Sequence, residues 1–143
     1  MKKILYLLLL LPLFTACDPS SGYDYYVENS LPEDIYITHK DGLYIPNIND
    51  GKAKLEVGAG KTVFIGYASM LGASNGSDIL GTYEPGDVVA VFKVWVGGEA
   101  EPVEITTYSS DWRYRLISRK DNKGEYTLLL NQELLDKVKK SAE

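Results

Sequence analysis

The sequence contains one cysteine and one histidine in 143 residues. An internal disulfide needs two cysteines, so a disulfide framework is excluded. Zinc and copper sites usually take several ligands from these two residue types, and Cys17 with His39 cannot supply such a set. The common metal sites are therefore not expected, and neither is a bound cofactor.

Long hydrophobic runs are scarce as well. The apolar run of residues 4–14 is about half of the roughly 20 residues that a membrane-spanning helix needs. Lys2 and Lys3 precede it, and small residues end it immediately before Cys17. A basic start, a short apolar core and small closing residues are typical of a secretory signal peptide, which we predict over residues 1–16.

Removal of this segment leaves 127 residues, a size that favours one domain with its own hydrophobic core. We expect residues 17–22, a polar and turn-forming stretch, to be a tether. The domain would then occupy residues 23–143. Because Lys2 and Lys3 leave with the signal, 13 basic residues face 20 acidic ones, a formal charge of −7. This acidity argues against nucleic acid as a partner.

Residues 13–17, Leu-Phe-Thr-Ala-Cys, resemble the lipobox of bacterial lipoproteins. Phe14 stands where a lipobox usually carries leucine. The resemblance implies that Cys17 becomes the acylated mature N-terminus and anchors the chain to the outer membrane, on the cell surface or the periplasmic face. Each buried methylene of the acyl chains contributes about 0.8 kcal/mol, so two or three chains anchor a small domain stably. The alternative is an ordinary cleaved signal peptide that leaves a free thiol.

The rest of the chain consists of short runs rich in Val, Ile, Tyr and Thr, separated by Gly, Pro, Asn and Asp. This texture predicts strands rather than long helices. The expected strands are residues 23–28, 34–39, 53–57, 61–67, 88–96, 102–108, 112–119 and 125–130. Residues 131–141 predict a short helix that Asn131 can cap. The fold class is therefore all-β: an immunoglobulin-like antiparallel sandwich of seven or eight strands, with a lipocalin-like barrel as the alternative. In general form the chain is similar to small lipoproteins of Gram-negative bacteria.

Alternation along the strands predicts which side chains face the core. In residues 88–96 the apolar set that we assign to the core is Val88, Ala90, Phe92, Val94 and Val96. In residues 112–119 the same alternation directs Arg113 and Arg115 outward and makes Trp112 a better core candidate than Trp95. His39 is expected to be exposed at a strand end. Residues 68–87 form a long connection that we interpret as a mobile, solvent-facing loop.

Aromatic residues carry the clearest functional signal, with eleven tyrosines in the chain. If residues 88–119 form a meander, one outer face would carry Lys93, Trp95, Glu104, Arg113 and Arg115. Such a face is either a binding platform or a layer in which arginine stacks on Trp95 and pairs with Glu104; the second interpretation is favoured. The candidate ligand-binding residues are Trp95, Lys93, Arg113 and Arg115.

Two functions remain open at this point. The first is a non-enzymatic, lipid-anchored binding module for a glycan or a protein. The second is a structural or assembly subunit of a larger envelope complex, which predicts an open sheet edge and an apolar patch. An enzyme ranks third, because it requires a cleft in which His39 meets carboxylates.

Overall fold

The computed structural model describes residues 20–43, 45, 54–71 and 76–141. These residues form eight strands, two short 3-10 helices and one α-helix. The elements are β1 (Ser20–Asn29), β2 (Ile35–Gly42), β3 (Leu55–Val57), β4 (Thr62–Leu71), η2 (Leu80–Thr82), β5 (Val88–Val96), β6 (Val103–Tyr108), η3 (Ser109–Asp111), β7 (Trp112–Ser118), β8 (Lys123–Leu130) and α2 (Gln132–Ser141).

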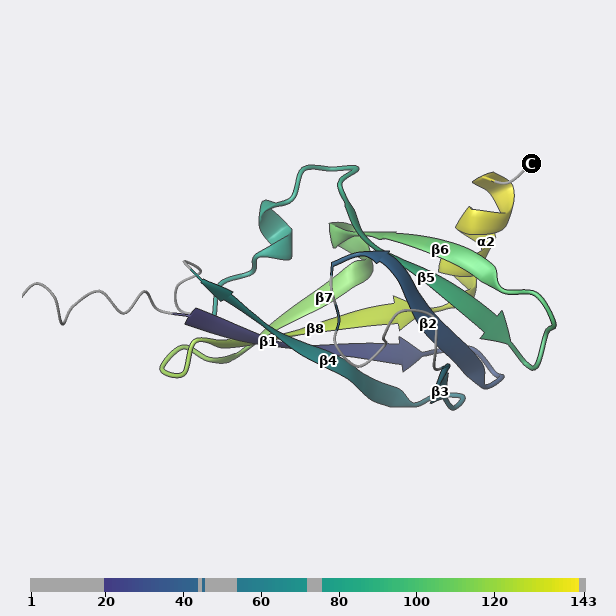
Figure 1. Cartoon of the computed structure of the whole chain (residues 1–143), viewed down its shortest axis with the longest axis horizontal. Helices are drawn as coiled ribbons and strands as arrows, with labels where there is room; N and C mark the ends of the chain where they lie inside the picture. The colour runs from purple at the N-terminus through teal and green to yellow at the C-terminus, as the bar shows by residue number, and fades with distance from the viewer. Residues whose placement is uncertain (1–19, 44, 46–53, 72–75, 142–143) are drawn as a thin grey trace, which may run out of the picture.

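The strands form two four-stranded sheets that enclose the core (Figure 1). Sheet A has the order β4-β1-β8-β7, and sheet B has the order β3-β2-β5-β6. All neighbouring strands are antiparallel except β1 and β8, which run parallel. The predicted all-β sandwich with a short C-terminal helix is confirmed. The described strands form two separate sheets and not one closed barrel, so the lipocalin-like alternative is wrong.

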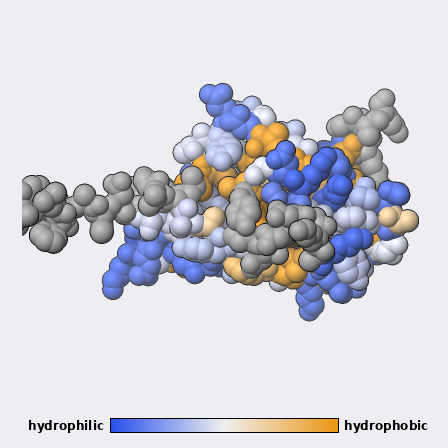
Figure 2. Space-filling view, viewed as in Figure 1, coloured by the Kyte–Doolittle hydropathy of each residue, from blue (hydrophilic) through white to orange (hydrophobic). Residues whose placement is uncertain are grey.

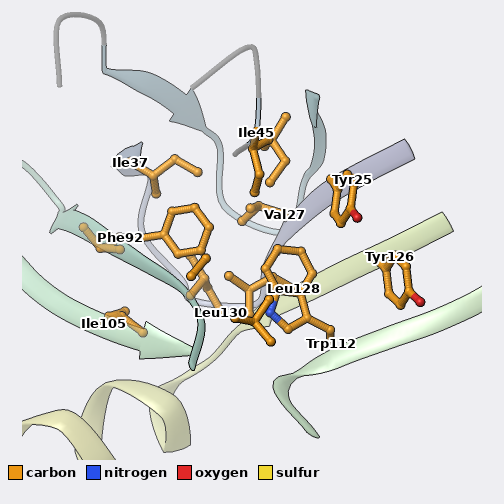
Figure 3. Close-up of a cluster of buried hydrophobic side chains, with 14 of the residues drawn as sticks. Tyr25, Val27, Ile37, Ile45, Phe92, Ile105, Trp112, Tyr126, Leu128 and Leu130 are labelled. Carbon is orange, nitrogen blue, oxygen red and sulfur yellow. The ribbon is translucent and has the colours of Figure 1, made fainter. Parts of the chain in front are cut away.

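Aliphatic side chains and several aromatic rings together fill the centre of the sandwich (Figure 3). The ring of Tyr126 stacks on Tyr25 at 5.5 Å between centroids, and Tyr25 meets Trp112 edge-on at 5.9 Å. Trp112 also contacts Phe92 of the opposite sheet at 6.3 Å. Burial of Trp112 is therefore confirmed, and these rings join the two sheets.

β5 departs from the predicted alternation at its first residue. Val88 is 48% exposed, whereas Val89 and Ala90 are buried. The pairing with β6 shifts between Val88 and Ala90, and this bulge turns Val89 inward in place of Val88. The assignment of Val88 to the core is therefore wrong, while that of Ala90, Phe92 and Val94 is confirmed.

The sandwich begins earlier than predicted. β1 starts at Ser20, and Ser21 is fully buried, so residues 20–22 belong to the domain and not to a tether. The domain boundary at residue 23 is thus three residues too late. The predicted signal peptide, Cys17 and the first part of the tether lie outside the described residues.

The described part of the long connection is docked against sheet A. Ile79 and Leu80 are buried, and three tyrosine hydroxyls hold this segment. Tyr23 donates to the carbonyl of Ser77 at 2.8 Å, Tyr126 donates to Asp78 at 2.7 Å, and Tyr114 donates to the carbonyl of Gly76. The interpretation of a solvent-facing loop is therefore wrong for Gly76, Ile79 and Leu80, whereas Ser77 and Asp78 are exposed. Residues 68–71 belong to β4. Residues 72–75 lie outside the described part.

The C-terminal helix packs beside sheet B. Leu134 and Leu135 of α2 are buried, and the side chain of Asn131 accepts a hydrogen bond from the backbone of Leu134 at 2.9 Å. The predicted helix and its cap are confirmed. No helix within the described ranges is long and apolar enough to cross a membrane.

Candidate ligand-binding face

The topology separates the predicted ligand-binding residues into two pairs. Lys93 and Trp95 lie on β5 in sheet B, whereas Arg113 and Arg115 lie on β7 in sheet A. The chain passes from one sheet to the other through η3, between β6 and β7. The expectation of a shared outer face is therefore wrong, because residues 88–119 do not form a single meander.

The outer face of sheet B satisfies its own charged groups. The ammonium group of Lys54 lies 3.8 Å from the ring centroid of Trp95, the position in which we expected an arginine. Lys40 forms an ion pair of 2.7 Å with Glu104, and this hydrogen bond lowers the pKa of Glu104. Lys93 lies opposite Glu104 in the register. The self-satisfied layer thus exists on this face, with lysines in place of the arginines.

The outer face of sheet A carries a larger set of exposed functional groups. The alternation of β1 places Tyr23, Tyr25 and Val27 in the core and the residues between them outside. Register pairing aligns these outer residues with outward residues of β4, β8 and β7. We call this surface the sheet A platform; it consists of Asp24, Tyr26, Glu28, Phe64, Tyr67, Arg113, Arg115, Lys123, Glu125 and Thr127.

Three ion pairs cross the strands of the platform. Arg113 bonds to Glu28 at 2.7 Å, and Lys123 bonds to Asp24 at 2.8 Å. One guanidinium nitrogen of Arg115 donates to both carboxylate oxygens of Glu125, each at 2.9 Å. Exposed pairs of this kind add little to stability. They do hold charged donors and acceptors in fixed positions on the surface.

Within these pairs the cations are more open than the acids. The side chains of Arg113 and Arg115 are 67% and 68% exposed, against 31% for Glu28 and 16% for Glu125. The carboxylates lie close to the sheet, and the guanidinium groups extend over it. Arginine has five donors, so each one keeps donors that a ligand can reach.

Aromatic rings form the β4 side of the platform. Tyr26 and Phe64 meet edge-on at 5.5 Å, and Phe64 and Tyr67 are 39% and 49% exposed. The ring of Tyr67 lies over Gly22: a Cβ built at Gly22 would lie 2.6 Å from its hydroxyl oxygen. Gly22 therefore lets this ring lie close against the sheet, with one side open to solvent.

A groove lies on the arginine side of the platform, two positions along β1 and β4 from Tyr26 and Phe64, which do not line it. Its volume is about 470 Å³, and its lining includes Thr62, Glu28, Thr127, Arg113 and Arg115. The pKa of Tyr26, at the centre of the platform, is raised by burial and then by the negative charges of Asp24 and Glu125. Tyr26 therefore keeps its hydroxyl proton and can donate a hydrogen bond at neutral pH.

A second groove, of about 420 Å³, lies between β6, η3 and α2. Tyr108, Asp111 and Leu134 are among its lining residues. The carboxylate of Asp111 already accepts a hydrogen bond from the backbone of Tyr108 at 2.8 Å. This groove offers one exposed ring and fewer charged groups than the platform, so the platform is the stronger candidate.

His39 does not lie in either groove. Its ring packs edge-on against Phe92 at 5.9 Å, and its Nε2 atom is buried with no hydrogen-bond partner among the described residues. The expectation of an exposed histidine is wrong, because position 39 falls on the inward side of β2 opposite Phe92. Within the described ranges no three acidic, histidine or cysteine side chains gather as a metal site would require.

Sequence reasoning identified the two arginines of the platform but missed Phe64 and Tyr67. Residues three apart lie on opposite faces of a regular strand. Here Ile65 is an extra residue in β4: Tyr26 pairs with Phe64, and Tyr25 pairs with Gly66. This bulge places both rings outside. Gly66, next to the extra residue, is the sequence signal that could have indicated it, because an isolated glycine inside a strand pattern suggests a bulge.

No protein-family model, curated protein or solved structure matches this chain.

Proposed function

We propose that this chain is a lipid-anchored, non-enzymatic binding module of the outer membrane that binds a glycan on the sheet A platform. The observation that carries the proposal is the row of Tyr26, Phe64 and Tyr67 beside a groove lined by paired arginines and glutamates. Sugar rings combine a flat apolar face with hydroxyl groups around the rim. Aromatic rings offer a surface for the former, and charged donors and acceptors bind the latter.

The platform is also arranged before any ligand arrives. The three ion pairs fix Asp24, Glu28 and Glu125 against their cations, and the close fit over Gly22 positions Tyr67. A ligand that binds ordered groups loses less conformational entropy on association. Positive and negative groups balance on this face, which favours a neutral or weakly charged glycan over a polyanion.

The anchor part of the proposal depends on Cys17. β1 begins at Ser20, only three residues later in the sequence, so an acylated Cys17 would hold the sandwich close to the bilayer. Mass spectrometry of the mature N-terminus tests acylation, with Cys17→Ala as the control. Protease treatment of intact cells then distinguishes a surface location from a periplasmic one.

We apply the description immunoglobulin-like only to the general two-sheet architecture. In an immunoglobulin constant domain the first two strands lie in the same sheet. Here β1 lies in sheet A and β2 in sheet B. The proposal does not need the finer assignment, because the binding groups belong to the outer face of one sheet.

Glycan arrays probed with the full chain test the binding site. We expect the double substitution Phe64→Ala and Tyr67→Ala to weaken binding by about tenfold or more, since aromatic contacts contribute on the order of 1 kcal/mol each. Trp95→Ala on sheet B is the matched control and should bind as the unchanged chain does. Binding that survives the double substitution and is lost with Trp95→Ala would place the site on the other sheet.

A second candidate is the structural or assembly subunit. β4 is ten residues long and, within the described residues, pairs with β1 alone. A long edge strand can accept a strand from another protein, and Phe64 and Tyr67 would then lie beside that contact. Cross-linking in cells with a photoreactive group at position 64 distinguishes the two functions: a protein adduct favours the subunit, and a carbohydrate adduct favours the binding module.

A further inference from the structure

The turn between β7 and β8 lies at the same end of the sandwich as the first residue of β1 (Figure 1). The backbone nitrogen of Gly22 donates to the carbonyl of Asn122 at 2.9 Å, and Gly22 pairs with Lys123. The helix α2 lies at the opposite end of the molecule (Figure 1). The turn and the first residues of β1 therefore lie together at the end of the sandwich opposite α2.

The sequence limits how far this end can lie from Cys17. Ser20 follows Cys17 by three residues, and each residue of an extended chain spans at most about 3.6 Å. Ser20 therefore lies within roughly 11 Å of the Cα atom of Cys17. If Cys17 is acylated, this end of the sandwich must lie next to the lipid headgroups.

The end of β7 and the turn that follows combine apolar and basic side chains on the surface. Leu116 and Ile117 are 37% and 44% exposed, and Arg119 and Lys120 are exposed directly after them. The pairing of Leu116 with Gly124 and of Ser118 with Lys123 leaves Ile117 as an extra, bulged residue. We call residues 116–120 the β7 tip.

The cations of the β7 tip have no acidic partner within the described ranges. Neither Arg119 nor Lys120 forms an ion pair there. The neighbouring carboxylate of Asp121 instead accepts a hydrogen bond from the hydroxyl of Ser118 at 2.7 Å. The tip therefore presents two positive charges without an ion-pair partner beside two exposed aliphatic side chains, and they outnumber the single negative charge of Asp121 next to them.

The turns at the opposite end of the sandwich carry four exposed acidic side chains: Glu33, Asp34, Glu99 and Glu101. The helix α2 at that end carries charges of both signs. On the face seen in Figure 2, hydrophobic patches are separated by hydrophilic residues. Exposed cations at the anchor-proximal end of an otherwise acidic protein are complementary to an anionic membrane when that end faces the bilayer.

We propose that the β7 tip rests on an anionic phospholipid bilayer, with Arg119 and Lys120 on the headgroup phosphates and Leu116 and Ile117 at the boundary with the acyl chains. This inference rests on the proposed lipid anchor at Cys17. Basic residues next to apolar ones are the side-chain pattern that binds at membrane interfaces. With this contact, β1 would start at the bilayer surface and run outward from it. The sheet A platform would then face parallel to the membrane plane, where a glycan can reach it.

Site-specific fluorescence on the acylated full chain tests the orientation. The purified protein is placed in vesicles of phosphatidylethanolamine and phosphatidylglycerol, with an environment-sensitive dye on Ile117→Cys. Ala100→Cys, an exposed position at the opposite end, is the matched control. We expect the dye at position 117 to be quenched severalfold less by aqueous iodide than the dye at position 100, and severalfold more by spin-labelled lipid.

Charge reversal then tests the role of the cations. Arg119→Glu with Lys120→Glu should return the iodide quenching at position 117 to the level seen at position 100, and high salt should do the same. Both residues are exposed outside the strands, so this variant should fold.

Mass spectrometry of Cys17 in the same samples separates the two proposals. With Cys17 acylated, equal quenching at positions 117 and 100 would overturn the orientation and leave the anchor intact. Shielding from iodide without quenching by spin-labelled lipid would overturn it too, because the tip would then be covered by protein. An unmodified Cys17 would overturn the anchor and the orientation together.

Discussion

Tyr25 and Tyr26 are consecutive in the sequence but belong to two different aromatic clusters. Tyr25 is fully buried, stacks on Tyr126 and meets Trp112 in the core. Tyr26 lies on the outer face of the same strand, where Phe64 is its ring neighbour. The same residue type therefore contributes to stability on one side of β1 and to a binding surface on the other.

The difference lies in what the rings and hydroxyls contact. In the inner cluster, Tyr23 and Tyr126 donate hydrogen bonds to residues 77 and 78, so these side chains fasten that segment to the sheet. In the outer cluster, Phe64 and Tyr67 keep a large part of their surface exposed. Substitutions in the inner cluster should therefore change folding, and those in the outer cluster should change ligand binding.

Alkaline pH should have the largest effect on the inner cluster. Burial is the main cause that raises the pKa of Tyr25 and of Tyr126 well above the ordinary value of about 10. The folded state therefore holds the phenol protons more tightly than the unfolded state does. Stability should be fully present below about pH 10 and fall as the pH rises further, because ionisation then favours the unfolded chain.

Thermal melts followed by circular dichroism at increasing pH, with tyrosinate absorbance recorded in parallel, measure this effect. We expect the buried phenols to ionise only together with unfolding. Ionisation of every tyrosine in a chain that remains folded would show that the inner hydroxyls are accessible to solvent.

Truncation of a single ring should have the next largest effect. Tyr126→Ala removes a fully buried ring that contacts Tyr23, Tyr25 and Tyr114, and should lower the free energy of unfolding by about 3–5 kcal/mol. The matched outer substitution, Tyr67→Ala, should change it by less than about 0.5 kcal/mol. Urea denaturation of both variants measures the two values, and a similar loss in both would remove the distinction between the clusters.

Much of this arrangement follows from patterns that are visible in the sequence. The eight strands and the C-terminal helix were all expected, with β5 at the observed bounds, because β-branched and aromatic runs between turn residues are strong local signals. Alternation predicted the outward Arg113 and the buried Trp112. These predictions used only the order of residues within a single strand, without any knowledge of its partner strands.

The errors about which side chains share a face arose where a strand gains an extra residue or where the chain changes sheets. Bulges at Val89 and Ile65 invert the alternation, and their position depends on the partner strand; Gly66 beside Ile65 is the only local signal for either. The crossing between β6 and β7 separates Trp95 from Arg113 by the full thickness of the sandwich. Pairing between strands is a long-range property, so a single sequence predicts the elements of this fold better than its binding face.

The smallest effect should come from the inner hydroxyl groups, and it should differ between two stacked rings. The hydroxyl of Tyr126 donates to Asp78 and accepts from the backbone of Leu80 at 3.1 Å, so Tyr126→Phe should cost about 1–2 kcal/mol of unfolding free energy. The hydroxyl of Tyr25 is buried and has no hydrogen-bond partner among the described residues. Tyr25→Phe should therefore leave stability unchanged or raise it by up to about 1 kcal/mol, since it removes a polar group that folding desolvates without compensation.

Urea denaturation of the two variants in parallel measures the change in unfolding free energy for each. A clear loss of stability in Tyr25→Phe would mean that this hydroxyl has a partner in a part of the chain outside the described residues, and that the inner cluster fastens more than one segment.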